Sequence, residues 1–227
     1  MTARTLVLFT LAVVLAVILT LIGYYWPIVW LVYIFKPIAT VLLSLIAISS
    51  WISNRSAYAQ WIVVGLVFSL LGDVLLMWPN HYFRAGLAAF LVTHVAYLVS
   101  FTRDCKFPAR LLIWFAYVVA AIACYALLLP TLPRGLWIPV AAYAALLSTM
   151  ASQAMGRFLA TETSYARRAA LGALLFLLSD LLLAFDRFRS PLLWSTVLIL
   201  VPYYIGQWLI ASSAPCARRL VQAQGQM

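Results

Sequence analysis

The sequence predicts an all-α integral membrane protein with eight transmembrane helices in one bundle. Hydrophobic residues make up 67% of its 227 residues and charged residues only 9%, far outside the composition of soluble globular domains. About eight apolar runs reach the roughly 20 residues that are needed to cross a bilayer. The connections between these runs are short, which leaves no room for a soluble domain.

The predicted spans cover the chain almost from end to end. We place them at about 5–23, 28–51, 58–78, 83–101, 111–130, 135–157, 166–186 and 192–213. Trp and Tyr residues cluster near these boundaries, as amphipathic rings favour the headgroup level. The first run is expected to be a span, because no small-residue cleavage site follows it. We therefore predict one domain over 1–227 that ends in a flexible polar tail at 214–227.

The net charge of +10 is distributed unevenly among the predicted loops. The side that holds both termini carries Arg4, Arg55, Arg103, Lys106, Arg110, Arg157, Arg167, Arg168, Arg218 and Arg219, whereas the opposite side carries Arg84, Arg134, Arg187 and Arg189. The positive-inside rule then predicts cytoplasmic termini, in the inner membrane if the host is bacterial. The basic charge therefore indicates topology and attraction to membrane lipids, and we expect neither a nucleic-acid partner nor an obligate protein partner.

An internal repeat divides the chain into halves at about 1–107 and 108–213. At an offset of 107 residues, Tyr58, Gly65, Gly72, Asp73, Leu75 and Leu76 fall on Tyr165, Gly172, Ser179, Asp180, Leu182 and Leu183. An offset of four spans preserves orientation, so we predict a parallel 4+4 duplication about an axis along the membrane normal. Asp73 and Asp180 would then share one depth, about 7–8 Å inside the non-cytoplasmic edge of the hydrocarbon, and Lys36 reaches a similar level.

Asp73 and Asp180 are the candidate catalytic residues, because a carboxylate inside an apolar span costs several kcal/mol and is rare without a function. Small residues beside them favour close approach of the third and seventh spans, which would bring the two carboxyls together. Two adjacent carboxyls in a low dielectric share one proton, so that one donates while the other accepts. We therefore expect an acid/base pair that adds water across a bond activated by protonation. The sequence leaves open which aspartate is the acid.

Other interpretations of these polar residues stay open. The aspartates could be structural, bonded between helices or paired with Lys36, or they could relay protons in a proton-coupled transporter. His94 and the stripe of Tyr203, Tyr204 and Gln207 either line a pocket around the aspartates or bond between helices.

The remaining titratable residues suggest no further chemistry. The chain has only two histidines and lacks zinc-ligand spacings, so we expect no metal and no other cofactor. Asp104, Glu162 and Asp186 are interpreted as ordinary solvated charges beside arginines. Cys105, Cys124 and Cys216 are interpreted as reduced structural thiols.

An ordered set of motifs resembles a known family. They are Lys36-Pro37, Leu71-Gly72-Asp73-x-Leu75-Leu76-Met77, Gly86-Leu87-x-x-Phe90-x-x-x-His94-x-x-Tyr97, Gly172-Ala173-Leu174-Leu175-Phe176-x-x-Ser179-Asp180 and Tyr203-Tyr204-x-x-Gln207. Over nearly the whole chain they are similar to the YhhN-type lysoplasmalogenase family. The resemblance implies a membrane hydrolase that cleaves the vinyl ether of lysoplasmalogens to a fatty aldehyde and glycerophosphoethanolamine or glycerophosphocholine.

The resemblance also implies roles for single residues. The family's catalytic aspartates correspond to Asp73 and Asp180. The lysophospholipid substrate would be bound by Lys36, His94, Tyr97, Ser179, Tyr203, Tyr204 and Gln207, with Arg84 or Arg187 meeting its phosphate at the rim. One departure is Asp186, where the family more often has Asn. The headgroup and the chain length of the substrate are left open.

Overall fold

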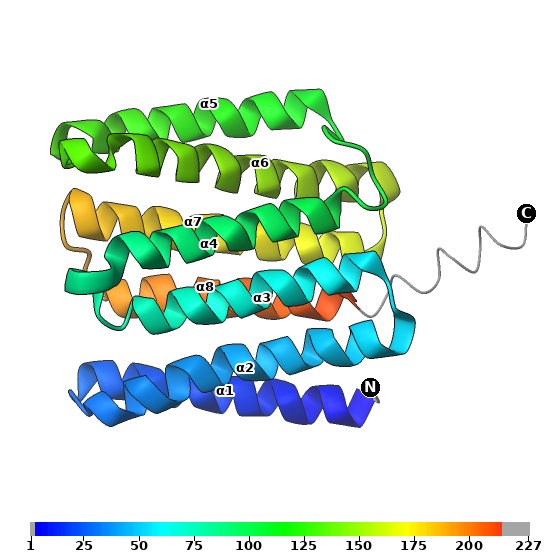
Figure 1. Ribbon diagram of the computed structural model, residues 1–227, viewed down its shortest axis with the longest axis horizontal. Helices are drawn as coiled ribbons and strands as arrows, with labels where there is room; N and C mark the ends of the chain where they lie inside the picture. The colour runs from blue at the N-terminus through cyan, green and yellow to red at the C-terminus, as the bar shows by residue number, and fades with distance from the viewer. Residues whose placement is uncertain (1–2, 215–227) are drawn as a thin grey trace, which may run out of the picture.

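The computed structural model describes residues 3–214, so the predicted tail and Cys216 lie outside the described residues. Eight α-helices lie side by side and alternate in direction through this range (Figure 1). They are α1 (Ala3–Tyr25), α2 (Val29–Asn54), α3 (Ala57–Leu75), α4 (Pro79–Phe101), α5 (Leu111–Leu128), α6 (Trp137–Thr161), α7 (Ser164–Phe188) and α8 (Ser195–Ser213), with the 3-10 turns η1 (Leu129–Thr131) and η2 (Arg134–Leu136) between α5 and α6. All eight are long and apolar enough to cross a membrane, which confirms the predicted fold class.

Two tight turns at one end of the bundle are built alike. Arg55 and Glu162 end α2 and α6 in the left-handed conformation, with φ of 50° and 51°, which is uncommon for residues other than glycine. Each N–H closes back onto the helix, to the carbonyls of Trp51 and Phe158. The two residues are 107 positions apart, the offset of the predicted repeat.

The small-residue faces of α3 and α7 do not pack against each other as predicted. A Cβ placed on Gly65 would lie 2.2 Å from the ring of Tyr97, so this face of α3 packs against α4. On α7, a Cβ on Gly172 would lie 2.6 Å from the carbonyl oxygen of Gly206 on α8. The glycines therefore bring together consecutive helices, and the expected approach of the third and seventh spans along these faces is wrong.

The two halves of the chain interlock through matching helix pairs. In addition to its neighbours in sequence, α2 contacts α8 and α6 contacts α4. A shift of four helices converts the first pair into the second. Helices α1 and α5 lie at opposite edges of the bundle (Figure 1). This arrangement agrees with the predicted duplication, which stays a prediction together with the orientation of the termini.

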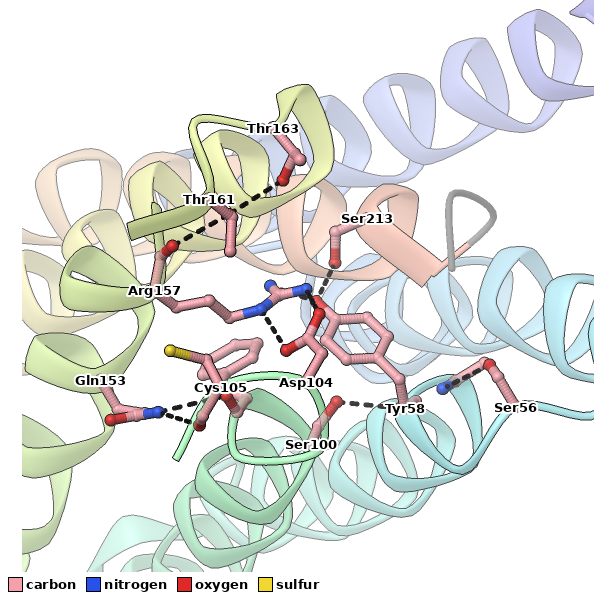
Figure 2. Close-up of polar contacts among 12 residues, drawn as sticks. Ser56, Tyr58, Ser100, Asp104, Cys105, Gln153, Arg157, Thr161, Thr163 and Ser213 are labelled. Carbon is pink, nitrogen blue, oxygen red and sulfur yellow. Dashed lines mark hydrogen bonds and ion pairs between the residues drawn. The ribbon is translucent and has the colours of Figure 1, made fainter. Parts of the chain in front are cut away.

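A buried arginine joins three helices and a loop at the end of the bundle that holds the α2–α3, α4–α5 and α6–α7 connections (Figure 2). Nε and Nη2 of Arg157 donate to the two carboxylate oxygens of Asp104, at 2.7 and 2.6 Å. Its guanidinium also lies 4.7 Å from the ring of Tyr58 and 5.0 Å from that of Tyr165. The interpretation of Asp104 as an ordinary solvated charge is therefore wrong, because it neutralises a fully buried cation.

Candidate active site

Asp73 lies in the last turn of α3, inside the bundle, where it is 2% exposed. Its Oδ2 accepts hydrogen bonds from Oγ1 of Thr40 at 2.6 Å and from the hydroxyl of Tyr203 at 2.7 Å. Nζ of Lys36 lies 3.8 Å from its Oδ1. Lys36 and Thr40 are one turn apart on α2 and so reach the same carboxyl. The negative end of the α3 dipole disfavours a carboxylate here, and Lys36 supplies the opposing charge.

Asp180 lies on α7 with a different set of partners. The hydroxyl of Tyr143 donates a short hydrogen bond to its Oδ2, and Nε2 of His94 lies 3.5 Å from the same oxygen. Nε2 of His94 is 2.9 Å from the Tyr143 oxygen, while its buried Nδ1 has no hydrogen-bond partner within residues 3–214. The geometry allows an Nε2–H of His94 to donate to Tyr143 while the Tyr143 hydroxyl donates to Asp180.

Each aspartate receives contacts from both halves of the chain. Asp73 of α3 receives Lys36 and Thr40 from α2 in its own half and Tyr203 from α8 in the other. Asp180 of α7 receives Tyr143 from α6 in its own half and His94 from α4 in the other. Neither half alone therefore carries a complete set of partners for its carboxyl.

Both aspartates border one cavity of about 290 Å³. Its polar lining consists of Tyr24, Lys36, Asp73, Ser179, Asp180, Asp186, Arg187, Ser195, Thr196 and Tyr203. In the part of the chain that the structure describes, no hydrogen bond joins the two carboxyl groups. The expected direct contact is thus not seen, and the carboxyls instead border the same space with separate sets of donors.

The other predicted binding residues fall into three groups. Lys36, Ser179, Tyr203 and Arg187 line the cavity. His94, Tyr97, Tyr204 and Gln207 lie behind this lining and orient it. Gln207 accepts from Tyr97 at 2.5 Å and donates to Ser69 at 2.8 Å and to Tyr203 at 3.4 Å, while Tyr204 donates to the carbonyl of Lys36 at 3.0 Å. Arg84 lines a separate cavity of about 280 Å³ between α4 and α6.

Sequence reasoning missed three residues of this site. Thr40 and Tyr143 donate directly to the aspartates, and Asp186, which was given no role, lines the cavity while accepting from the N–H of Leu192 at 2.8 Å. The sequence did contain a signal for Tyr143, because Tyr143 is the position that corresponds to Lys36 in the predicted repeat of 107 residues. Thr40 had the weaker signal of lying one turn after Lys36.

The site is equipped for proton transfer. Two carboxyls, a lysine ammonium and several hydroxyls surround one internal space, which suits an acid and a base acting on a bound molecule. Within residues 3–214, no group of three or more His, Cys, Asp or Glu side chains is placed to hold a metal ion.

Comparison with known proteins places the chain in a family. The YhhN family model matches residues 31–214. The chain is 38% identical to the human protein named lysoplasmalogenase TMEM86A, over 72% of this chain and 69% of that one, and 37% identical to its Bos taurus counterpart over the same shares. It is 33% identical to lysoplasmalogenase TMEM86B of Sus scrofa, over 78% of this chain and 74% of that one. No solved structure is significantly similar. The chain belongs to the YhhN family.

Proposed function

We propose that this protein is a lysoplasmalogenase, which hydrolyses the vinyl ether of a lysoplasmalogen to a fatty aldehyde and glycerophosphoethanolamine or glycerophosphocholine. The names of the TMEM86A and TMEM86B relatives support this activity. The observation that carries it to this chain is the cavity bordered by both Asp73 and Asp180, each with its own hydrogen-bond donors. The same names do not favour the alternative of a proton-coupled transporter.

Hydrolysis of a vinyl ether needs one proton donor and one base. A carboxylic acid protonates the β-carbon and leaves an oxocarbenium ion, and water then attacks the α-carbon while a carboxylate takes its proton. In a low-dielectric cavity the carboxylate also stabilises the cation electrostatically. Asp73 and Asp180 supply both groups when the pair holds one proton.

The surroundings of the two aspartates favour different roles. Asp73 has the ammonium of Lys36 beside Oδ1 and two hydroxyl donors on Oδ2, so we assign it as the carboxylate that stabilises the cation and activates water. Both contacts of Asp180 go to its Oδ2, and no Lys or Arg of residues 3–214 forms an ion pair with it. We assign Asp180 as the acid, with the transferable proton on Oδ1.

The same two groups complete the reaction. Asp180, now a carboxylate, takes the hydroxyl proton of the hemiacetal as its carbonyl forms. Asp73 returns the proton that it took from water to the departing glycerol oxygen, and the carbon–oxygen bond breaks. Both aspartates then regain their starting states, and the sum is one vinyl ether plus one water giving one aldehyde and one alcohol.

The cavity also carries charges that suit a phosphodiester headgroup. Arg187 lines it, with its guanidinium 5.6 Å from the ring of Phe83, and is free of any ion pair to an acid within the described range. A guanidinium is a suitable phosphate donor. Asp186 beside it would accept the ammonium of an ethanolamine group.

The test is aldehyde release from an alkenyl lysophospholipid by purified protein in detergent, where no membrane gradient exists. We expect Asp73→Asn and Asp180→Asn each to lower kcat at least about 100-fold while the protein still elutes as a folded species. Glu162→Gln, at an exposed turn outside the site, is the matched control and should keep wild-type activity. Wild-type rates in either aspartate variant would remove the pair from the mechanism.

A further inference from the structure

A second, apolar cavity lies next to the candidate active site. It is a groove of about 390 Å³ between α5, α6 and α7. Alanines on α5, including Ala116, Ala120 and Ala121, leave space against Leu147 of α6 and Leu177 of α7. Asp180 is the one charged residue in its lining, within the part of the chain that the structure describes. The groove is therefore an apolar channel with the proposed acid in its wall.

The groove and the cavity that holds both aspartates share Asp180 in their linings. A small space of about 60 Å³ lies between them and is also bordered by Asp180. It shares Tyr143 and Ala184 with the groove, and Phe90 and Leu183 with the polar cavity. The three spaces therefore meet at the side chain of Asp180, which lines all of them.

The direction and length of the groove suit one lipid chain. On α5 its lining runs from Leu128 to Ala116, about 18 Å at 1.5 Å per residue. A hydrocarbon core about 30 Å thick gives each leaflet roughly 15 Å, the depth that one lipid chain spans. On α7 the lining runs from Leu174 to Ala184, so a chain that starts at the Asp180 carboxyl and runs toward the middle of the membrane has about 9 Å of this groove for its first carbons.

We propose that this groove binds the alkenyl chain of the substrate and sets the chain-length preference. The proposal rests on the proposed function and deepens it. The phosphodiester lies in the polar cavity beside Arg187, the vinyl ether lies at Asp180, and the hydrocarbon lies along α5, α6 and α7. A single groove accommodates a single chain, so the site selects lysophospholipids over two-chain lipids.

The bundle offers a matched control. A groove of the same volume, about 390 Å³, lies between α1 and α8, and among residues 3–214 no charged side chain, and neither aspartate, lines it. Val14 and Ile205 line this control groove. Bilayer lipid would fill both grooves nonspecifically, whereas only the groove at Asp180 should affect substrate choice.

The first experiment compares kcat/KM for octadec-1-enyl and oct-1-enyl lysolipids. Since one methylene in an apolar pocket changes kcat/KM by roughly tenfold or more, Ala116→Trp at the far end of the groove should lower the long-chain value at least about tenfold and spare the short-chain one. Val14→Trp in the control groove should leave the ratio unchanged. An unchanged ratio in Ala116→Trp, or an equal change in both variants, would overturn the proposal.

The second experiment needs no turnover and no variant. An alkyl-ether lysolipid with a diazirine at the chain terminus, which has no vinyl ether to cleave, is crosslinked to the wild-type protein. Labelling of peptides from α5, α6 or α7 near Ala116 is expected, and labelling confined to α1 and α8 would refute the groove assignment. Hydrolysis without this crosslink would overturn the groove alone, and the crosslink without hydrolysis would overturn the proposed function alone.

Discussion

Lys36 on α2 and Tyr143 on α6 lie 107 residues apart, and each contacts the aspartate of the next helix. The two contacts are alike in position but not in charge. Lys36 brings a positive charge to Asp73, whereas Tyr143 brings a neutral hydroxyl to Asp180. One charged and one neutral partner give the two carboxyls different environments, which suits the proposed roles of base and acid.

Replacing Lys36 tests the charge on Asp73. Lys36→Met removes the positive charge that lies 3.8 Å from the buried Asp73 carboxyl, on which the proposed role of Asp73 as the carboxylate depends. We expect kcat to fall at least about 100-fold, with partial recovery in Lys36→Arg, which keeps the charge. A Lys36→Met protein with wild-type kcat and an unchanged pH–rate profile would show that Asp73 does not act as the carboxylate.

Replacing Tyr143 tests the network around Asp180. Tyr143→Phe removes the donor to Asp180 and the nearest partner of His94 Nε2, which leaves the buried imidazole and the partly buried carboxyl each short of a hydrogen bond. Each such group costs about 1–3 kcal/mol, so the thermal midpoint should fall and kcat should fall with it. Tyr33→Phe is the control, because Tyr33 is 39% exposed on α2, stacks on Trp78 and lines neither cavity beside Tyr143 and the aspartates. Equal thermal midpoints for the two variants would contradict the claim that the hydrogen bonds of Tyr143 stabilise the protein.

The eight helices could be predicted from the sequence because an apolar run of membrane length is a local signal. Asp73, Asp180 and Lys36 were also evident, since charges inside such runs are rare. The donors Thr40 and Tyr143 were not singled out, despite the offset that pairs Tyr143 with Lys36, because hydroxyl side chains are common in spans and their partners lie on other helices. The choice between Arg84 and Arg187 depends on which face of each helix borders the cavity, and no sequence pattern contained that information.

The buried arginine at the other end of the bundle yields a stability prediction. Arg157→Met leaves the Asp104 carboxylate without its counter-charge and removes the guanidinium contacts with the rings of Tyr58 and Tyr165. Breaking a buried pair costs about 3–5 kcal/mol, and the 25% exposure of Asp104 places the expected loss at the lower end. Unfolding at increasing SDS concentrations measures this loss of stability. The double variant Arg157→Met/Asp104→Asn should recover part of it. A variant as stable as wild type would mean that the cluster does not stabilise the fold.

The loop between α4 and α5 yields a pH prediction. Burial, together with the neighbouring Asp104 carboxylate, raises the pKa of the Cys105 thiol above its ordinary value of 9.0, against the opposing effect of Arg157. A higher pKa means less reactive thiolate at any given pH. The test uses a Cys124→Ser/Cys216→Ser protein, in which Cys105 is the remaining thiol. The pH at which its alkylation rate is half-maximal should lie above 9.0 in the folded protein and should shift to a lower pH when the protein is denatured. A folded midpoint below the denatured one would contradict this.

The predicted orientation decides which leaflet supplies the substrate. The polar cavity opens near the α3–α4 and α7–α8 connections, the end that the charge distribution assigns to the non-cytoplasmic side. In a protein whose native cysteines are replaced by serine, Ser190→Cys reports on this end and Lys106→Cys on the opposite one, both at exposed positions. An impermeant maleimide added to right-side-out vesicles should label Ser190→Cys at once and Lys106→Cys only after permeabilisation. The reverse pattern would place the cavity, and the headgroup it binds, at the cytoplasmic leaflet.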